Sequence, residues 1–323
     1  MDPYINEWLN LIIRFAHIVT GIAWIGASFY FVWLDNHLEN PPKWKQDKGI
    51  GGDLWAIHGG GFYEVAKYKL APENMPTTLH WFKWEAYSTW ITGFFLFVLM
   101  FYVGAQSYLI DNTKAELSVP AAIAISLGTL FIGWLIYDTL CKSPLAKNSW
   151  LLAGLLLAAI GALAWGLSLW FSDRAAYLHV GALLGTCMAG NVFRIIMPGQ
   201  RAMVAAIKAG EIPDAKYAKA SKLRSIHNNY LTLPVIFIMI SNHYPMTYGH
   251  PQAWAVLLAI IIIGAWARHF FNLRHKGITK PSILISAGVG LAALAWVVAP
   301  KPATMANANI PPVSDEQVLA IVS

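Results

Sequence analysis

Charged residues are scarce in this chain. They make up 12% of its 323 residues, whereas a soluble domain carries about 25%, and 57% of the residues are hydrophobic. Together with a mean hydropathy of +0.48, this composition indicates an integral membrane protein whose surroundings are a lipid bilayer. The lysines and arginines lie in a few loops, so the pI of 9.2 is a topology signal and nucleic acid is not an expected partner.

Cysteine is equally scarce, and a cleavable leader is lacking. Cys141 and Cys187 both fall at or within apolar segments, so a disulfide framework is excluded and a bond between them is not expected. The first apolar stretch, roughly 8–34, is too long for a signal peptide and has no small-residue cleavage motif. It therefore indicates a membrane-spanning helix.

Long apolar runs are abundant. A spanning helix needs about 20 mostly apolar residues. Eight segments qualify, namely 8–34, 84–106, 119–141, 149–171, 176–197, 224–243, 252–272 and 282–299. The sixth is the weakest, because it is short and contains Pro234. We predict an all-α integral membrane protein, with one eight-helix membrane domain over residues 1–300.

Lysine and arginine are concentrated in every second loop of this arrangement. The alternate loops hold only Lys114 and Arg174. Because cytoplasmic loops carry the excess of positive charge, the loops 35–83 and 198–223 are expected in the cytoplasm. Both termini of this multi-pass chain are then expected on the periplasmic side of a bacterial inner membrane.

Two segments outside the apolar runs have patterns of their own. Within 35–83, DLWAIHGGGFYEVAKYKL predicts a strand, a glycine turn and a second strand, which is a β-hairpin capping the cytoplasmic face. In PPVSDEQVLAIVS, Ser314 and Gln317 form a weak capping box at the start of a helix. Residues 301–323 are therefore expected to be a linker and the start of a further domain.

A faint internal repeat runs through the apolar segments. AHIVTGIAWIGASFYF in the first and LHVGALLGTCMAGNVF in the fifth each set a histidine before small residues. The second and sixth segments each open near a histidine, His80 and His227. Four plus four helices would form parallel repeats about an axis along the membrane normal, although chance explains two matched histidines equally well.

Several of the ten histidines lie inside or at the ends of the apolar segments, in an outer and an inner layer. Two layers of neutral imidazoles suit axial ligation of haem iron, whereas any single one is more simply an interhelical hydrogen-bond partner. Arg14, one turn from His17, is placed to pair with a haem propionate. The candidate ligands of one or two b-type haems are His17, His179, His243 and His269.

The stretch LHWFKWEAYSTW, residues 79–90, brings titratable groups to the start of the second segment, and RSIHNNYLTLP brings polar groups to the sixth. A base, cations, amides and flat aromatic faces together suit a small, planar, anionic substrate. The candidate catalytic residues are His80, Lys83, Glu85 and His227. The candidate substrate-binding residues are Trp81, Arg224, Asn228, Asn229 and Asn191.

A simpler interpretation exists for part of this pattern. The tryptophans alone are typical of an aromatic belt, with Lys83 reaching to the lipid headgroups. The belt does not explain Glu85, because a carboxylate near hydrocarbon normally needs a partner. In NVFRIIMPGQR, Arg194 either joins a polar inner cavity or extends toward the headgroups, with Pro198 ending the helix.

LWAIHGGGFYEVAKY, LHWFKWEAYSTW, HVGALLGT, NVFRIIMPGQR and RSIHNNYLTLPVIFIMISNHYP together resemble the membrane-bound, cytochrome c-linked urate oxidase (urate hydroxylase) family over nearly the whole chain. The resemblance implies an eight-helix membrane domain followed by a c-type cytochrome domain. It also implies oxidation of urate to 5-hydroxyisourate, with electrons passed to the cytochrome rather than directly to oxygen. DEQVLAIVS resembles the first helix of that domain, although no CxxCH follows it.

The resemblance implies urate as substrate and, as electron acceptor, a C-terminal cytochrome c domain carrying haem c or a soluble cytochrome c. If urate enters from the cytoplasm, electrons have to cross the bilayer to reach haem c, which requires one or two b-type haems inside it. His80 or His227 is then the candidate base, assisted by Lys83 and Glu85. Two other functions fit the residues, namely a b-type cytochrome that oxidises quinol or another small reductant, and a non-enzymatic purine transporter.

Overall fold

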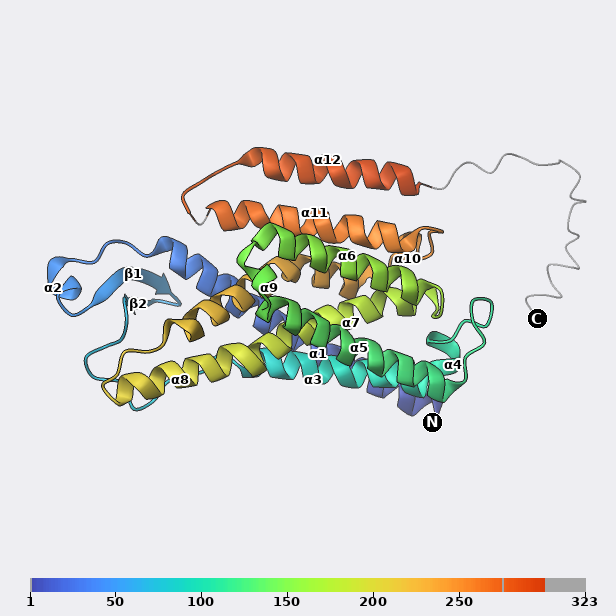
Figure 1. The fold of residues 1–323 in the computed structure, drawn as a ribbon, viewed down its shortest axis with the longest axis horizontal. Coiled ribbons are helices and arrows are strands. Elements are labelled where there is room, and N and C mark those ends of the chain that lie inside the picture. Colours follow the sequence, from blue (N-terminus) through green and yellow to red (C-terminus); the bar gives the residue numbers. More distant parts are fainter. Residues whose placement is uncertain (1, 275, 300–323) are drawn as a thin grey trace, which may run out of the picture.

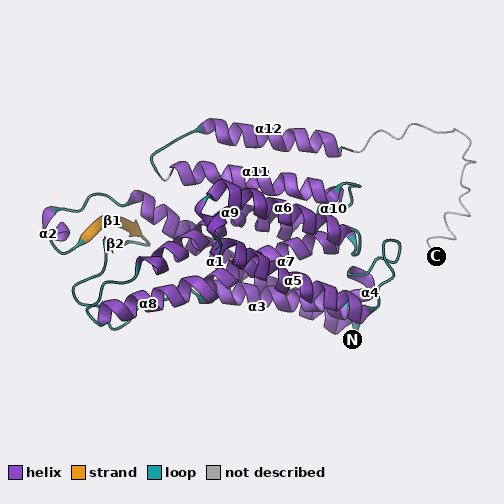
Figure 2. Ribbon diagram, in the orientation of Figure 1, coloured by secondary structure: helices purple, strands orange, loops and turns teal. Residues whose placement is uncertain are grey.

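The computed structural model describes residues 2–274 and 276–299, which form a bundle of long helices with one small hairpin (Figures 1 and 2). The predicted linker and cytochrome segment at 301–323 lies outside the described residues. Within them, seven helical segments are long and apolar enough to cross a membrane, by length and composition. They are Pro3–His37, Trp84–Val103, Val119–Lys142, Ser149–Ser168, Asp173–Lys208, Ala253–Arg274 and Pro281–Val298.

The main helices follow the predicted apolar segments. They are α1 (Pro3–His37), α3 (Trp84–Val98), α5 (Val119–Lys142), α6 (Ser149–Ser168), α7 (Asp173–Asn191), α8 (Met197–Lys208), α9 (Ala215–Ser241), α11 (Ala253–Arg274) and α12 (Pro281–Val298). Short helices α2 (Lys43–Gln46), α4 (Ala105–Tyr108) and α10 (Pro245–Tyr248) lie in the connections. Several helices begin at a side-chain cap that satisfies free amide groups, as Ser118 does for α5 and Ser172 for α7.

Helix α9 accounts for the difference between eight predicted spans and seven apolar ones. It contains the predicted sixth segment, 224–243, but begins earlier, at Ala215. Its first turns carry Lys216, Lys219 and Lys222, and polar residues continue to Asn229, so its composition is not that of a simple apolar span. Pro234 lies inside α9 without ending it.

The fifth predicted segment also differs from expectation, because its helix does not end at Pro198. Helix α7 continues through a π-helical turn, Val192–Ile196, directly into α8. Proline has no amide hydrogen to donate, and the local change of helical register absorbs that missing bond. Much of the predicted loop 198–223 is therefore helix, formed by α8 and the start of α9.

The predicted hairpin is confirmed. Strand β1 (Ile50–His58) pairs antiparallel with β2 (Gly61–Tyr68). Gly59 and Gly60 make the two-residue turn with φ of +57° and +82°, a conformation that costs glycine little and other residues more. Lys45 forms a buried ion pair with Asp53 and a second, half-exposed one with Glu64, which tie α2 to the hairpin.

The helices pack in pairs. Helix α1 packs along α3, and α7 packs along α9, while α11 lies between α9 and α12 and also contacts α6. The core of buried apolar side chains lies among α3, α5, α6, α7 and α11. The hairpin lies at one end of the bundle, and the first residues of α1 and the last of α12 lie at the other (Figure 1). In the predicted four-plus-four repeat, α1 would correspond to α7 and α3 to α9. This correspondence stays a prediction.

Candidate functional site

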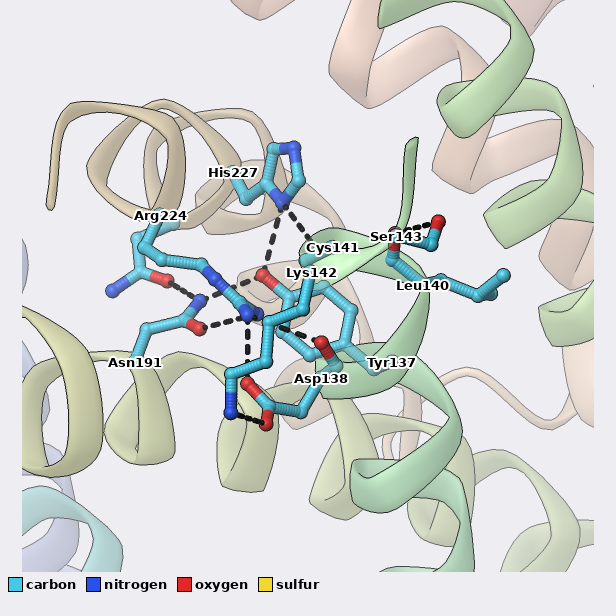
Figure 3. A network of polar contacts seen from close by, with 10 residues as sticks. Tyr137, Asp138, Leu140, Cys141, Lys142, Ser143, Asn191, Arg224 and His227 are labelled. Carbon is cyan, nitrogen blue, oxygen red and sulfur yellow. Dashed lines mark hydrogen bonds and ion pairs between the residues drawn. The ribbon is translucent and has the colours of Figure 1, made fainter. Parts of the chain in front are cut away.

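A buried ion pair joins α9 to the last turns of α5 (Figure 3). Arg224 Nη2 lies 2.7 Å from Asp138 Oδ1 and 3.3 Å from the Asp138 carbonyl oxygen. The two side chains are 3% and 13% exposed. The second carboxylate oxygen of Asp138 accepts from Lys142 at 2.5 Å, so the acid stands between two cations. The guanidinium also lies over the Tyr137 ring, 5.0 Å from its centroid.

Amide and aromatic side chains extend this ion pair into a network. Asn191 accepts from Arg224 at 3.2 Å and donates both to the Tyr137 hydroxyl and to Asn228 Oδ1, each at 2.8 Å. The Tyr137 hydroxyl lies 2.9 Å from His227 Nδ1 (Figure 3). Three helices, α5, α7 and α9, therefore supply one continuous set of hydrogen bonds.

The hydrogen bonds of the network limit the roles that Arg224 and His227 can have. The charge of Arg224 is balanced by Asp138, so in this arrangement the guanidinium is not an open anion site. The Tyr137–His227 hydrogen bond can run in either direction, because both groups can donate or accept. Only when His227 Nδ1 donates to Tyr137 is Nε2 unprotonated and able to act as a base.

A cavity of about 330 Å³ lies between the pair α1 and α3 and the pair α7 and α9. Its lining is mostly apolar, with Phe97, Phe101 and Met239 among the contributing side chains. Asn228 lines the cavity and also belongs to the polar network, so the two features meet at this residue. The volume falls in the range of ligand pockets, about 300 to 1,000 Å³.

His17 lines the cavity from α1 with a defined ring orientation. Its Nδ1 lies 3.0 Å from the Thr89 carbonyl oxygen, which can only accept, so Nδ1 carries the proton. The Nε2 lone pair is then free, as it is in metal-ligating histidines held by a second partner. A Cβ atom on Gly93 would come within 2.8 Å of the His17 ring, so glycine at this position leaves room for it.

Arg14, one turn from His17, also lines the cavity. Its guanidinium donates to Asn10 Oδ1 at 3.0 and 3.1 Å and to Met100 Sδ at 3.4 Å. Within residues 2–274 and 276–299, no carboxylate forms an ion pair with it. A cation in an apolar span is costly without a counter-ion, so the residues here fit a flat, apolar ligand with acidic groups, such as haem.

Two other candidate haem ligands have protein partners on their ring nitrogens. His179 is fully buried, donates from Nδ1 to the Ala175 carbonyl and accepts at Nε2 from Ser126 Oγ at 2.7 Å. In this arrangement it has no free lone pair for iron. His269 hydrogen bonds through Nδ1 to Tyr230 at 2.6 Å and stacks on Trp266, and it does not line the cavity.

The candidate residues before α3 lie apart from the polar network. His80 is exposed and packs edge-on against Phe82, and Lys83 lies over the Trp84 ring at 5.8 Å. Among the described residues, no hydrogen bond or ion pair joins them to Arg224 or its partners. Trp81 packs against the small apolar cluster of α3 and the helix that follows α7.

Glu85 has one feature that sets it apart. Its Oε2 atom is buried and has no hydrogen-bond partner within the described part of the chain. Glu85 lies one turn before Thr89, which lines the cavity, so it stands on the same helical face at the hairpin end. A buried carboxylate oxygen without a partner costs free energy, which makes Glu85 a better candidate than the exposed His80.

Asn228 and Asn229 are adjacent in sequence but face different surroundings. Asn229 Oδ1 accepts from Arg268 Nε of α11 at 2.7 Å, and it does not line the cavity. Arg268 in turn lies over the Phe29 ring at 4.2 Å. The structure therefore brings Asn191, Arg224, His227 and Asn228 together and leaves Asn229 outside the group.

Two members of the network, Tyr137 and Asp138, were not among the residues expected from the sequence. A signal for them was present, because Asp138 is the only acidic residue within Val119–Lys142. Ionisable residues inside apolar segments are rare and usually have a partner or a function. The same rule that selected Glu85 therefore also selects Asp138.

Comparison with known proteins gives one result. The family model described as urate oxidase N-terminal matches residues 3–299, which is nearly the whole described part of the chain. The searches of curated proteins and of solved structures find no match. The family match covers all helices that build the polar network and the cavity. The chain belongs to the urate oxidase N-terminal family.

Proposed function

We propose that this protein oxidises urate to 5-hydroxyisourate within a membrane and passes the electrons to a c-type cytochrome. The family match over residues 3–299 carries the proposal, because it relates the chain to urate oxidation. The seven apolar helices support a location in a membrane. We place the protein in a bacterial inner membrane, with the hairpin in the cytoplasm and both ends of the bundle domain in the periplasm.

The reaction can be written with atoms and electrons in balance. Urate and one water molecule give 5-hydroxyisourate, two protons and two electrons. The new bond joins the water oxygen to C5 of the purine, and both protons leave to a base or to solvent. The protein therefore needs a base near the substrate and an acceptor that takes two electrons.

Urate binds, in this proposal, at the hairpin end of the cavity. Asn228 presents an amide there that can hydrogen bond to the edge of a purine ring, and Asn191 holds that amide in place. His227 is the candidate base, acting at Nε2 while Nδ1 donates to Tyr137; it does not line the cavity and is joined to Asn228 through Tyr137 and Asn191. Glu85, with its buried free oxygen, is the second candidate for holding a proton.

A b-type haem is the group proposed to fill the rest of the cavity. His17 would hold it through Nε2, and Arg14 would hold a propionate. When bound, the haem would supply single-electron transfer along the cavity. The acceptor beyond it is a cytochrome c, as a domain of the same chain or as a soluble partner that carries haem c.

A urate-dependent reduction assay tests the proposal. The purified protein, loaded with haem, is mixed with urate and oxidised cytochrome c in water enriched in ¹⁸O. We expect two cytochromes reduced for each urate, and one labelled oxygen in the product. Reduction by a quinol but not by urate would instead favour the b-type cytochrome, and the absence of any bound haem would favour the transporter.

The two neighbouring asparagines offer a matched pair of variants. Asn228→Ala removes an amide that lines the cavity and is expected to raise KM for urate about tenfold, the cost of one hydrogen bond to a substrate. Asn229→Ala removes an equal side chain that faces Arg268 and is expected to leave KM unchanged. Equal effects of the two changes on KM would contradict the proposed position of urate.

A further inference from the structure

Two histidines from different helices reach the same level of the cavity. A Cβ atom on Gly21 of α1 would lie 3.9 Å from Met239 Cε of α9, which sets these two positions opposite each other. The two helices run in opposite directions, so moving four residues toward the N-terminal end of the bundle leads to His17 on α1 and to His243 just after α9. Both residues line the cavity.

The spacing also gives both side chains the right direction. Residues four apart lie on the same face of a helix, so His17 shares the face of Gly21. His243 stands four residues after Met239, and the helical turn continues to it, since its amide donates to the Ile240 carbonyl at 3.0 Å. Both residues line the cavity, His17 from within α1 and the exposed His243 from the turn that follows α9.

In neither ring does a described protein group occupy the nitrogen that iron ligation requires. Hydrogen bonding to the Thr89 carbonyl leaves the Nε2 lone pair of His17 free. The His243 ring takes part in no hydrogen bond or ion pair with the residues that the structure describes. Neither histidine, then, has to give up a protein partner of its lone pair to bind a metal, whereas His179 would, and His269 does not line the cavity.

The same end of the cavity has unsatisfied polar groups. Arg14 lines it without an acidic partner in the described chain, and Asn242 lines it with an amide oxygen that is buried and unpartnered. A buried polar group without a partner costs free energy, and such groups usually have a water or a ligand. A ligand with carboxylates at this end would satisfy Arg14.

The walls between these groups leave room for a flat, apolar ligand. A Cβ atom on Gly185 of α7 would meet nothing within 4 Å, and on Gly21 it would meet only ordinary contacts. Phe97 and Phe101 supply apolar surface. Helix α1 packs on α3, and the lining positions on α1 extend from Arg14 to Ser28, so the cavity runs along this helix between the two helix pairs.

We propose that the cavity binds one b-type haem with His17 and His243 as its two axial ligands and with Arg14 at a propionate. The proposal deepens the proposed function, on which it rests for the role of the haem in electron transfer. The pairing itself rests on three observations. His17 and His243 lie at the same level of the cavity, each has a ring nitrogen that no described protein group occupies, and Arg14 has no acidic partner in the described chain. It leaves His179 and His269 as structural residues.

Spectroscopy of the purified full chain tests the pairing without any activity measurement. The protein is produced with a haem precursor, and its haem content and electron paramagnetic resonance spectrum are recorded. We expect a low-spin haem b with two histidine ligands. His17→Ala and His243→Ala should each convert that signal to high-spin or lose one haem per chain, whereas the matched change His269→Ala should leave it unaltered.

Two further measurements keep the test decisive if an alanine variant folds poorly. Added imidazole should restore the low-spin signal in His243→Gly, because it can occupy the vacated position. Gly93→Ala, which pushes on the His17 ring without removing it, should shift the spectrum. A wild-type low-spin signal in all of these variants, or haem loss in His269→Ala alone, would overturn the pairing, as would a haem-free protein.

The outcomes also separate this inference from the proposed function. If His17 and His243 ligate haem but urate does not reduce the protein, the proposed function is wrong and the pairing stands. If urate reduces the protein while both alanine variants keep the low-spin signal, the pairing is wrong and the function stands.

Discussion

Asp138→Asn removes the carboxylate that pairs with the buried guanidinium of Arg224. The two side chains are 3% and 13% exposed, and removing one partner of a buried pair costs about 3–5 kcal/mol. Asparagine keeps an oxygen that can accept from Arg224, so we expect about 3 kcal/mol. Loss of the second ion pair of Asp138, with Lys142, adds little to this destabilisation, because the Lys142 side chain is 60% exposed.

A double-mutant cycle isolates the interaction. Asp138→Asn, Arg224→Met and the double variant are unfolded in mixed detergent micelles, and the free energies of unfolding are compared. Arg224→Met also removes the hydrogen bond to Asn191 and the contact with Tyr137, so that single variant is expected to be the least stable. The double variant should lose about 2 kcal/mol less than the sum of the two single changes.

Additivity would refute the reasoning. If the two changes add within about 0.5 kcal/mol, the pair is not coupled and Arg224 is free for another role. The KM for urate then tests whether Arg224 binds the substrate. A guanidinium that binds urate directly would give a higher KM in Arg224→Met and a lower one in Asp138→Asn, since the latter releases it from its partner.

Three further changes have defined outcomes. Gly93→Ala should reduce haem content or shift the haem spectrum, because its Cβ would come within 2.8 Å of the His17 ring, whereas Gly154→Ala, which meets nothing within 4 Å, should not. Glu85→Gln should leave the unfolding midpoint equal or higher, since an unpartnered buried oxygen destabilises the fold, but should slow urate turnover about 100-fold. Two carboxylates raise the pKa of Lys45. Their pairing should therefore protect the hairpin from proteolysis at pH 7 to 10, with protection lost as the pH rises through the raised pKa, and Lys45→Met should remove it at neutral pH.

The helices and the hairpin were predictable because their signals are local. Apolar runs of about 20 residues marked the spans, and three successive glycines between β-rich segments marked the turn at Gly59 and Gly60. The end of the fifth helix was not predictable in the same way. Whether a proline stops a helix depends on the register before it, and the π-helical turn ahead of Pro198 is not visible in the sequence pattern.

The candidate site was predictable in part, for a related reason. Helical spacing placed Arg224, His227 and Asn228 on one stripe, and these residues do share the network. Spacing gives no information on the partner helix, so the Asp138 carboxylate, 86 positions away, was missed. It also does not separate neighbours by surroundings, and Asn229 faces α11 although it follows Asn228 directly.

Polar side chains inside this bundle differ in whether the protein itself satisfies them. Arg224 forms an ion pair with Asp138, and both ring nitrogens of His179 form hydrogen bonds with the protein. A structural role accounts for such residues. Others along the cavity or one turn from it lack a complementary partner in the described chain, namely Arg14, which has no acid, and Glu85 and Asn242, each with a buried oxygen that accepts no hydrogen bond. Since a membrane interior offers little water to compensate them, their cost is best met by ligands. Glu85 and Asn228 lie toward the hairpin end of the cavity, and Arg14 and the two proposed haem ligands lie toward the other end, which is the order that the proposed transfer of electrons from urate to haem requires.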